Sequence, residues 1–468
     1  MKEYDLIVIG SGPAGEKAAV KAAYFGHRVA LIEREPLFGG AEVVTGTLPS
    51  KTLKETALFF SGKYEKGLFG IERDLQREAS ISDFMYRKNL ITLSEAKEVQ
   101  QNLFRHSVDI YRGEACFEDA HTIRISSPSD TKIHGHFILI ATGSYPYHPP
   151  TIPFDHTRVH DSDSILEITR FPSSLCVLGA GVIGCEYATI FSTVGAKVFL
   201  VNDKQEILPH IDSEITTELV RQMQGSGIEI LFQESLKGID IPKDETKPLL
   251  VHLNSGKTLE ADMFLFAAGR SGNIQNLGLA TLGIKIGKRQ AIEVDSSYRT
   301  NVPNIYAAGD VIGFPALAST SMEQGRVAVS NMFKTKDLEE VPQILPYGIY
   351  TIPEVSMVGL TEQEAKLKLP SFKTGIARYK DMPRGKIMGA TGGFLKLVFE
   401  TPSLAVHGVH VIGHIATELV HFGMHLVQEK KTLYYVIGQV YNYPTLHDLY
   451  KYAAYDGLSN VAGHKVKP

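Results

Sequence analysis

The feature that most constrains the fold of this chain is a strand–turn–helix unit with three spaced glycines, which occurs twice. The turns hold, in chain order, Gly10, Gly12 and Gly15, and then Gly179, Gly181 and Gly184. An apolar strand is expected before each turn, at 6–9 and at 175–178. Glycines at this spacing allow a tight turn and a close approach of the backbone to a pyrophosphate, and the following helix N-terminus holds the anion. Two such units predict two dinucleotide sites; the alternative is a pair of plain glycine-rich turns.

Each unit continues into a second strand whose last residue is expected to read the ribose. This residue is Glu33 in the first copy and Asn202 in the second, and each stands 23 positions after the first glycine of its turn. A carboxylate accepts from both ribose hydroxyls and repels a 2′-phosphate, whereas an amide can donate or accept. We therefore expect the second site to admit NADP as well as NAD. Lys204 is a further candidate for the phosphate, and a solvated loop lysine is an equal alternative.

The length and composition are those of a globular protein with several domains. The chain has 468 residues, too many for one core, with 43% hydrophobic and 21% charged residues. A net charge of −4 gives no reason to expect a nucleic-acid or membrane surface, and no apolar run approaches the ~20 residues of a spanning helix. The first strand follows Met1 closely, so no signal peptide is expected. The three cysteines form no metal-ligand pattern; we expect no metal and a reducing, cytoplasmic location.

The pattern along the chain predicts an α/β fold with two Rossmann-like dinucleotide-binding domains and a C-terminal α+β domain. The first domain is expected at 1–150, with a helix over 90–110, and the second at 151–271 after a proline-rich linker. A return to the first domain follows at 272–340. The C-terminal domain is expected at 341–468, where short alternating runs such as 394–399 indicate strands.

Further short motifs stand along the whole chain, at 10–15, 39–51, 141–143, 179–186, 268–270, 308–310 and 443–445. With these motifs the sequence resembles the flavin-dependent (class I) pyridine nucleotide–disulfide oxidoreductases from end to end. The resemblance implies FAD in the first site, NAD or NADP in the second, and a C-terminal domain that forms a homodimer or a larger homo-oligomer. It also places Asp310 on the ribityl chain of the flavin, whereas helix capping is the alternative.

The resemblance assigns the cofactor-binding residues position by position. They are Gly10, Gly12, Pro13, Ala14, Gly15, Glu33, Arg34, Gly40, Thr47, Ser50, Lys51, Ala115, Ala141, Thr142, Gly143, Gly179, Gly181, Val182, Ile183, Gly184, Glu186, Asn202, Lys204, Ala268, Gly269, Arg270, Gly309, Asp310, Leu317 and Ala318.

The chain lacks the groups with which the disulfide reductases of this family act. Where those enzymes carry two cysteines, this chain has Glu42 and Thr47, and where they carry a histidine and its carboxylate, it has Tyr443 and Asp448. A dithiol relay needs two sulfurs and a base that makes a thiolate. We therefore exclude reduction of glutathione, lipoamide, thioredoxin or mercuric ion by the usual route of the family.

What remains is hydride exchange between nicotinamide and flavin. The resemblance pairs Lys51 with Glu186 beside the reactive nitrogen of the flavin, where a lysine favours negative charge on the ring. A solvated helix lysine is the alternative for Lys51. The resemblance also implies that Tyr443 lies beside the flavin of the other subunit, where we expect it to close the pocket. Simple packing in the interface is the alternative.

Several strings, among them 46–51, 144–149, 181–188 and 348–354, resemble one subgroup without the cysteine pair, the soluble pyridine nucleotide transhydrogenases. That resemblance implies a ping-pong reaction through FAD in which NADPH + NAD⁺ give NADP⁺ + NADH. An NAD(P)H oxidase or quinone reductase is the first alternative, and a catalytically idle binding protein is the second. One departure remains, because the subgroup usually keeps a single cysteine where this chain has Glu42.

Overall fold

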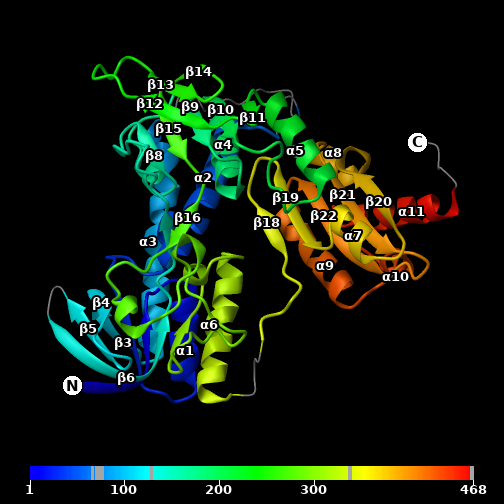
Figure 1. Ribbon diagram of the computed structural model, residues 1–468. Helices are drawn as coiled ribbons and strands as arrows, with labels where there is room; N and C mark the ends of the chain where they lie inside the picture. The colour runs from blue at the N-terminus through cyan, green and yellow to red at the C-terminus, as the bar shows by residue number, and fades with distance from the viewer. Residues whose placement is uncertain (65–67, 69–78, 127–129, 336–339, 464–468) are drawn as a thin grey trace.

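The computed structural model describes residues 1–64, 68, 79–126, 130–335 and 340–463, so the end of the expected C-terminal domain at 464–468 lies outside the described residues. In Figure 1 the first domain lies at the bottom, the second at the top, and the third beside the second. The expected fold class is confirmed: two nucleotide-binding folds, the first on a mixed sheet with a parallel centre and the second on a parallel sheet, are followed by an α+β domain.

The first domain is built on a seven-stranded sheet in the order β3-β2-β1-β6-β5-β4, with β17 paired to β6. Its strands are β1 (Lys2–Ile9), β2 (Val29–Glu33), β3 (Asp109–Arg112), β4 (Glu114–Phe117), β5 (Thr122–Ser126), β6 (Thr131–Ile140) and β17 (Ile305–Ala307), and its helices are α1 (Pro13–Tyr24), α3 (Ile81–Arg105) and α6 (Ala318–Phe333). β17 pairs in parallel with the last residues of β6, so the return segment completes the first sheet. The helix expected over 90–110 is α3, which begins nine residues earlier and gives way to β3.

The second domain repeats the plan with a parallel sheet in the order β11-β10-β9-β15-β8. Its elements are β8 (Val159–Asp161), β9 (Ser174–Leu178), β10 (Lys197–Asn202), β11 (Glu229–Phe232), β15 (Met263–Phe266), α4 (Val182–Thr193) and α5 (Ser213–Gly225), with an antiparallel sheet of β12 (Leu236–Asp240), β13 (Leu249–Leu253) and β14 (Thr258–Ala261). A two-stranded ribbon of β7 (Ser144–Pro146) and β16 (Arg270–Gly272) joins the two domains.

The third domain is an antiparallel sheet in the order β18-β19-β22-β21-β20, with helices packed on it. Its elements are β18 (Tyr347–Ile349), β19 (Glu354–Gly359), β20 (Phe372–Arg378), β21 (Phe394–Glu400), β22 (Val406–Gly413), α7 (Glu362–Lys368), α8 (Pro383–Ile387), α9 (Ala416–Gln428), α10 (Leu433–Gly438) and α11 (Asp448–Ala462). The strand expected at 394–399 is therefore β21.

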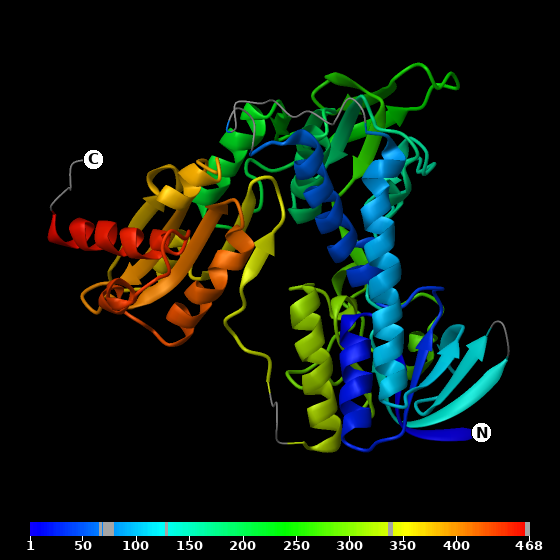
Figure 2. The same cartoon turned by 180° about the vertical axis from the view of Figure 1, so that it is seen from behind.

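Helix α2 (Thr47–Ser61) links all three domains. It leaves the first domain beside α3 and reaches α4 of the second, as Figure 2 shows from behind. Leu53 and Ala57 of α2 belong to one apolar core with Cys185 of α4 and Val355 of β19. This shared core fixes α2 against α4, where the two partners of the expected ion pair lie.

Candidate nucleotide sites

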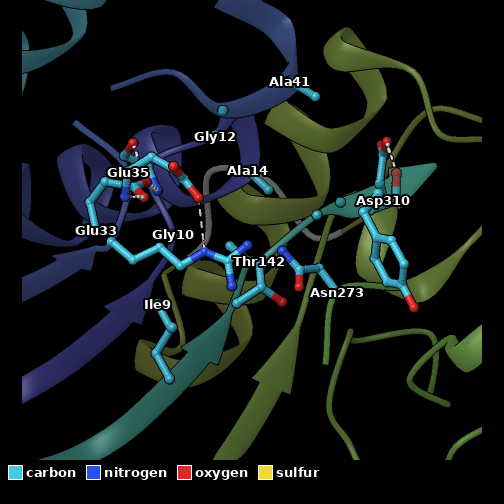
Figure 3. A pocket seen from close by; sticks show the side chains of 18 of the residues that line it. Ile9, Gly10, Gly12, Ala14, Glu33, Glu35, Ala41, Thr142, Asn273 and Asp310 are labelled. Atoms are coloured by element: carbon cyan, nitrogen blue, oxygen red, sulfur yellow. Dashed lines mark hydrogen bonds and ion pairs between the residues drawn. The ribbon is translucent and has the colours of Figure 1, made fainter. Parts of the chain in front are cut away.

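A cavity of about 570 Å³ lies at the carboxyl ends of β1, β2 and β6 (Figure 3). Gly10 has φ +104°, and a Cβ there would lie 2.4 Å from the carbonyl oxygen of Ala141. A Cβ on Gly15 would lie 2.0 Å from the carbonyl oxygen of Gly10. The first glycine is therefore needed for the turn and the third for the contact of α1 with the turn that precedes it.

Most of the residues assigned to the first nucleotide line this cavity. They are Gly10, Gly12, Pro13, Ala14, Glu33, Arg34, Gly40, Thr47, Ala115, Ala141, Thr142, Gly143, Gly309, Asp310 and Ala318. Gly15, Ser50, Lys51 and Leu317 are not among the lining residues. Ser50 instead donates its hydroxyl to the carbonyl of Gly46, at 2.8 Å.

The carboxylate of Glu33 is held at the end of β2. It accepts hydrogen bonds from the backbone N–H of Ser11 at 2.9 Å, the hydroxyl of Ser11 at 2.6 Å and the backbone N–H of Glu35 at 2.8 Å. These donors fix the carboxylate at the cavity wall, where Figure 3 labels it. Ser11 was not predicted as a site residue, although its place between two glycines of the turn is visible in the sequence.

The cavity has features that fit a bound dinucleotide. A Cβ on Gly40 would lie 3.0 Å from the Cα of Gly12, so the two glycines leave a cradle that a side chain would fill. The buried hydroxyl of Thr142 has no hydrogen-bond partner among the residues that the structure describes. Asp310 accepts from the hydroxyl of Ser144 at 3.0 Å and does not cap the short helix that it begins. Asn273, which sequence reasoning missed, also lines the cavity.

The second glycine turn has the same geometry as the first. Gly179 has φ +105°, and a Cβ on Gly184 would lie 1.8 Å from the carbonyl oxygen of Gly179. A Cβ on Gly181 would meet no atom within 4 Å, so the backbone is open where α4 begins with Val182 and Ile183. The turn is thus shaped to let a pyrophosphate approach the N-terminus of α4.

The residues after β15 connect this site to the domain junction. Ala268 and Gly269 follow β15, and Arg270 begins the ribbon that returns to the first domain. The guanidinium of Arg270 donates to the carbonyl of Ser144 at 2.8 Å and to Asp163 at 3.0 Å. Arg270 is therefore engaged in joining the two nucleotide domains.

Asn202 ends β10 with its side chain buried. Its amide nitrogen donates to the backbone carbonyls of Lys204 at 3.2 Å and of Glu206 at 2.9 Å. Both hydrogens of this amide are therefore used by the loop, and only its Oδ1 atom is left to accept a hydrogen bond from a nucleotide. Of the two expected roles, donor and acceptor, the structure leaves the acceptor role. Lys204 is exposed in the same loop.

Lys51 and Glu186 form the ion pair that the resemblance implied. The Nζ atom of Lys51 lies 3.0 Å from Oε1 and 2.8 Å from Oε2 of Glu186. Glu186 is 3% exposed, and its Oε1 also accepts from the backbone N–H of Tyr350 at 2.9 Å. The alternative of a solvated Lys51 is thus not what the structure shows.

Glu42 and Tyr443 occupy different surroundings. Glu42 lies in a π-helical turn at Ala41–Thr45 and lines the cavity of the first domain. Burial raises the pKa of its carboxyl, Lys17 opposes this, and Glu16 adds to it. Tyr443 lies in the loop between α10 and α11 and is 69% exposed in the single subunit. Its expected action in the partner subunit remains a prediction.

Two further findings concern metal ligands and membrane helices. Within 1–64, 68, 79–126, 130–335 and 340–463, no three His, Cys, Asp or Glu side chains gather as metal ligands would. The helices in those ranges are also too short or too polar to cross a bilayer.

The family comparison covers nearly the whole chain. Residues 4–325 match the family described as pyridine nucleotide-disulphide oxidoreductase, and residues 345–454 match the dimerisation domain of that family. The soluble pyridine nucleotide transhydrogenase of Mycobacterium tuberculosis is 39% identical over 464 residues, which cover 98% of each chain. The protein of the same name from Pseudomonas putida is 39% identical over 466 residues, which cover 98% of this chain and 99% of that one.

Solved structures agree in fold. The HOCl-induced flavoprotein disulfide reductase RclA from Escherichia coli is 26% identical with a TM-score of 0.85, over 96% of this chain and 99% of that one. LpdA from Mycobacterium tuberculosis has a TM-score of 0.89 at 24% identity, over 97% of this chain and 99% of that one, which is a likeness of fold alone.

Proposed function

From the premise that this chain belongs to the pyridine nucleotide-disulphide oxidoreductase family and is an oxidoreductase, we propose that it transfers hydride from NADPH to NAD⁺ through FAD. NADPH and NAD⁺ are consumed, and NADP⁺ and NADH are formed. The two relatives at 39% identity are named soluble pyridine nucleotide transhydrogenases, which supports this substrate pair. A cytoplasmic location is proposed with it, since those names describe soluble proteins.

The observation that carries the proposal is an intact Lys51–Glu186 pair in a chain without a thiol pair. By the resemblance to the family, Glu42 and Thr47 stand at the positions where the disulfide reductases have cysteines. The thiols of Cys176 and Cys185 are fully buried, and burial raises the pKa of Cys176 to about 12. Since a thiolate is the reactive form, neither can relay electrons to a disulfide substrate.

The cavity of the first domain is proposed as the FAD site. FAD, when bound, would take up the hydride and give it to the second nucleotide. Lys51 holds a positive charge that Glu186 fixes in place, and such a charge in a largely buried site favours negative charge on a nearby ring. Glu33 would accept from the ribose of FAD, and Asp310 from its ribityl chain.

The second glycine turn is proposed to bind NADPH and NAD⁺ in alternation, which makes the kinetics ping-pong. Asn202 offers one acceptor oxygen, which suits the ribose hydroxyls of both nucleotides. Lys204 is exposed two residues further and would meet a 2′-phosphate when one is present.

A homodimer is proposed through the third domain, which matches the dimerisation domain of the family. The segment 434–455 leaves several large side chains open in the single subunit. These are Tyr434, Val440, Tyr443, Tyr452 and Tyr455, which are 47% to 96% exposed. An apolar and aromatic surface of this kind is typical of a contact between subunits.

The test is anaerobic mixing of the purified yellow protein with NADPH, followed by NAD⁺. We expect NADPH to bleach the visible flavin absorption and NAD⁺ to restore it with formation of NADH. Bleaching that only oxygen or a quinone reverses would assign the chain to the oxidases or quinone reductases. Turnover of a disulfide substrate faster than of NAD⁺, or a protein that purifies without flavin, would overturn the proposal.

A further inference from the structure

A short segment of the third domain, residues 350–354, crosses to the ion pair between α2 and α4. The backbone N–H of Tyr350 donates to Oε1 of Glu186 at 2.9 Å. The ring centroid of Tyr350 lies 4.9 Å from the Nζ atom of Lys51 and 5.7 Å from that of Lys54. One residue therefore contacts both members of the Lys51–Glu186 pair, the carboxylate through its backbone and the ammonium through its ring.

The residues that follow Tyr350 are anchored to both helices. The backbone N–H of Ile352 donates to the hydroxyl of Thr189 at 3.1 Å, and Thr189 lies three residues after Glu186 on α4. Glu354 forms a buried ion pair with Lys54 of α2. These contacts fix residues 350–354 against α2 and α4.

The far end of the segment is also held within the third domain. Glu354 accepts from the backbone N–H of Thr417 at 3.0 Å and from its hydroxyl at 2.7 Å. Lys54 and Glu354 are 3% and 6% exposed, so the tie is shielded from solvent. Because α9 carries Thr417, the position of Tyr350 is set by the fold of the third domain rather than by its own loop.

The ring of Tyr350 suits the task of holding Lys51. A lysine side chain has four rotatable bonds, and that of Lys51 is 24% exposed, so a further contact beside those with Glu186 and Ser50 restricts its movement toward solvent. An aromatic ring within about 6 Å attracts an ammonium group electrostatically and offers it no competing acceptor. Both ammonium groups on α2 lie within this range, and Lys54 is already immobilised by Glu354.

We infer that Tyr350 is a positioning residue for the proposed hydride transfer, which holds the Lys51–Glu186 pair in place by a cation–π contact and a backbone hydrogen bond. The inference rests on the proposed function, since it concerns the same site. It implies that the third domain contributes to the reaction within one subunit. The phenolic hydroxyl interacts with Thr417 and does not contact the pair, because the ring face and the backbone N–H make those contacts.

The test compares Tyr350→Phe with Tyr350→Leu in the full-length, FAD-loaded protein. Tyr350→Phe keeps an aromatic face, so the NADPH-to-NAD⁺ rate should stay within about twofold of the natural protein. Tyr350→Leu removes it, so the rate should fall by about tenfold or more. If Tyr350→Leu does not fold, Tyr350→Met replaces it, because methionine is unbranched and flexible.

A readout besides turnover is the midpoint potential of the bound flavin, measured by dye-equilibrated titration. Tyr350→Leu should make this potential more negative, in the direction of Lys51→Met, and the double variant should be no more negative than Lys51→Met alone. Tyr435→Leu is the matched control, because it removes a cation–π contact with Lys431 at 5.2 Å in the same domain. It should leave the potential unchanged.

Three results would overturn the inference: a potential that is unaltered in Tyr350→Leu, equal changes in Tyr350→Phe and Tyr350→Leu, or full additivity with Lys51→Met. A protein in which NADPH bleaches the flavin but NAD⁺ does not restore it would contradict the proposed function instead. The potential can still be measured in that protein, so the two failures are distinguishable.

Discussion

Asn202 and Glu33 end the same strand in two copies of one fold, but Asn202 donates both amide hydrogens to its own loop whereas Glu33 accepts three hydrogen bonds. The second copy has Ala180 where the first has Ser11, so no hydroxyl is present to hold a carboxylate there. The amide therefore both stabilises the loop after β10 and limits what the site can offer a nucleotide.

Asn202→Asp should destabilise the protein by about 1–3 kcal/mol, because it leaves two carbonyls without donors and faces them with a carboxylate. Urea unfolding at neutral pH measures this. Asn202→Ser, which can still donate one hydrogen, is the control and should be less destabilised. Equal stability of Asn202→Asp and the natural protein would show that the two hydrogen bonds contribute nothing.

Lys204→Ala should weaken NADPH binding by about tenfold, the scale of one charge-assisted hydrogen bond, and should leave NADH binding nearly unchanged. The reason is that Asn202 has no hydrogen left to donate to a 2′-phosphate. Dissociation constants for both nucleotides decide the matter, with Lys204→Arg as the variant that keeps the charge. An equal loss for NADPH and NADH would remove Lys204 from phosphate recognition.

Glu42→Gln should raise the midpoint potential of the bound flavin at about pH 8 by about 30 mV, which corresponds to about 1.4 kcal/mol for a two-electron couple. A carboxylate in the cavity disfavours added negative charge, and an amide of the same size does not. The pKa of Glu42 is raised by burial, so the carboxyl becomes protonated as the pH falls, and the difference between the two proteins should shrink. Glu95→Gln is the control, because the charge of Glu95 also raises the pKa of Glu42 but Glu95 does not line the cavity. A difference that does not change with pH would contradict this account.

The sequence predicted the parts of the fold that local sterics determine. Gly10 and Gly179 both adopt positive φ in the expected turns. The start of α3 was missed, although Ser80 and Asp83 form a capping box there, because the apolar spacing was evident only further along the chain. A capping signal is local, and reading it would have placed the helix correctly.

The residues of the candidate site were predictable only where they belong to a motif of the family. Lys51 and Glu186 are 135 positions apart, and no spacing rule joins them. The hydrogen bonds of Asn202 depend on how residues 203–206 fold back, and the place of Tyr350 depends on the packing of a whole domain against α2. Neither leaves a local signal, because side-chain packing between domains is not periodic in the sequence.

A cluster of charges at the junction of the second and third domains gives a prediction on pH. Lys396 is fully buried and pairs with Asp212 at 3.0 Å and with Glu362 at 2.5 Å. Nearby, Nε2 of His410 donates to the carbonyl of Leu360 at 2.9 Å, and its buried Nδ1 has no partner within the part of the chain that the structure describes. Burial disfavours the charged form of this ring and lowers the pKa of His410 below its ordinary value of 6.5. A second proton, on Nδ1, would also have no acceptor among the described residues.

His410 should therefore make the protein less stable as the pH falls. Below pH 6.5 the unfolded chain binds a proton at this residue that the folded protein does not, and the free energy of unfolding decreases by at most about 1.4 kcal/mol per pH unit. His410→Gln should lessen this decrease between about pH 6.5 and 5. His136→Gln is the control; this histidine is exposed, and the variant should leave the decrease as it is. The same dependence of the free energy of unfolding on pH in all three proteins would contradict the prediction.

The last prediction concerns two tyrosines of the third domain that sequence alone does not distinguish. Tyr450 is fully buried; its hydroxyl donates to the carbonyl of Leu419 at 2.6 Å and accepts from the backbone N–H of Gly423 at 3.0 Å. Tyr443 is 69% exposed in the single subunit. Tyr450→Phe should lower the free energy of unfolding by about 1–3 kcal/mol, because a buried donor and acceptor lose their partner.

Tyr443→Phe should leave that free energy unchanged to within about 0.5 kcal/mol, as is usual for a surface position. It should also keep NADPH-to-NAD⁺ transfer within about tenfold, since at most one hydrogen bond across the proposed dimer is lost. Urea unfolding and steady-state turnover, with sedimentation to confirm the dimer, measure both variants. Deletion of residues 439–468 is a less specific test. It removes α11, which packs against β20 and β21, so the deletion itself would unfold the domain. A loss of turnover of about 10³-fold in Tyr443→Phe with the dimer intact would contradict this prediction and would make its hydroxyl an acid–base group.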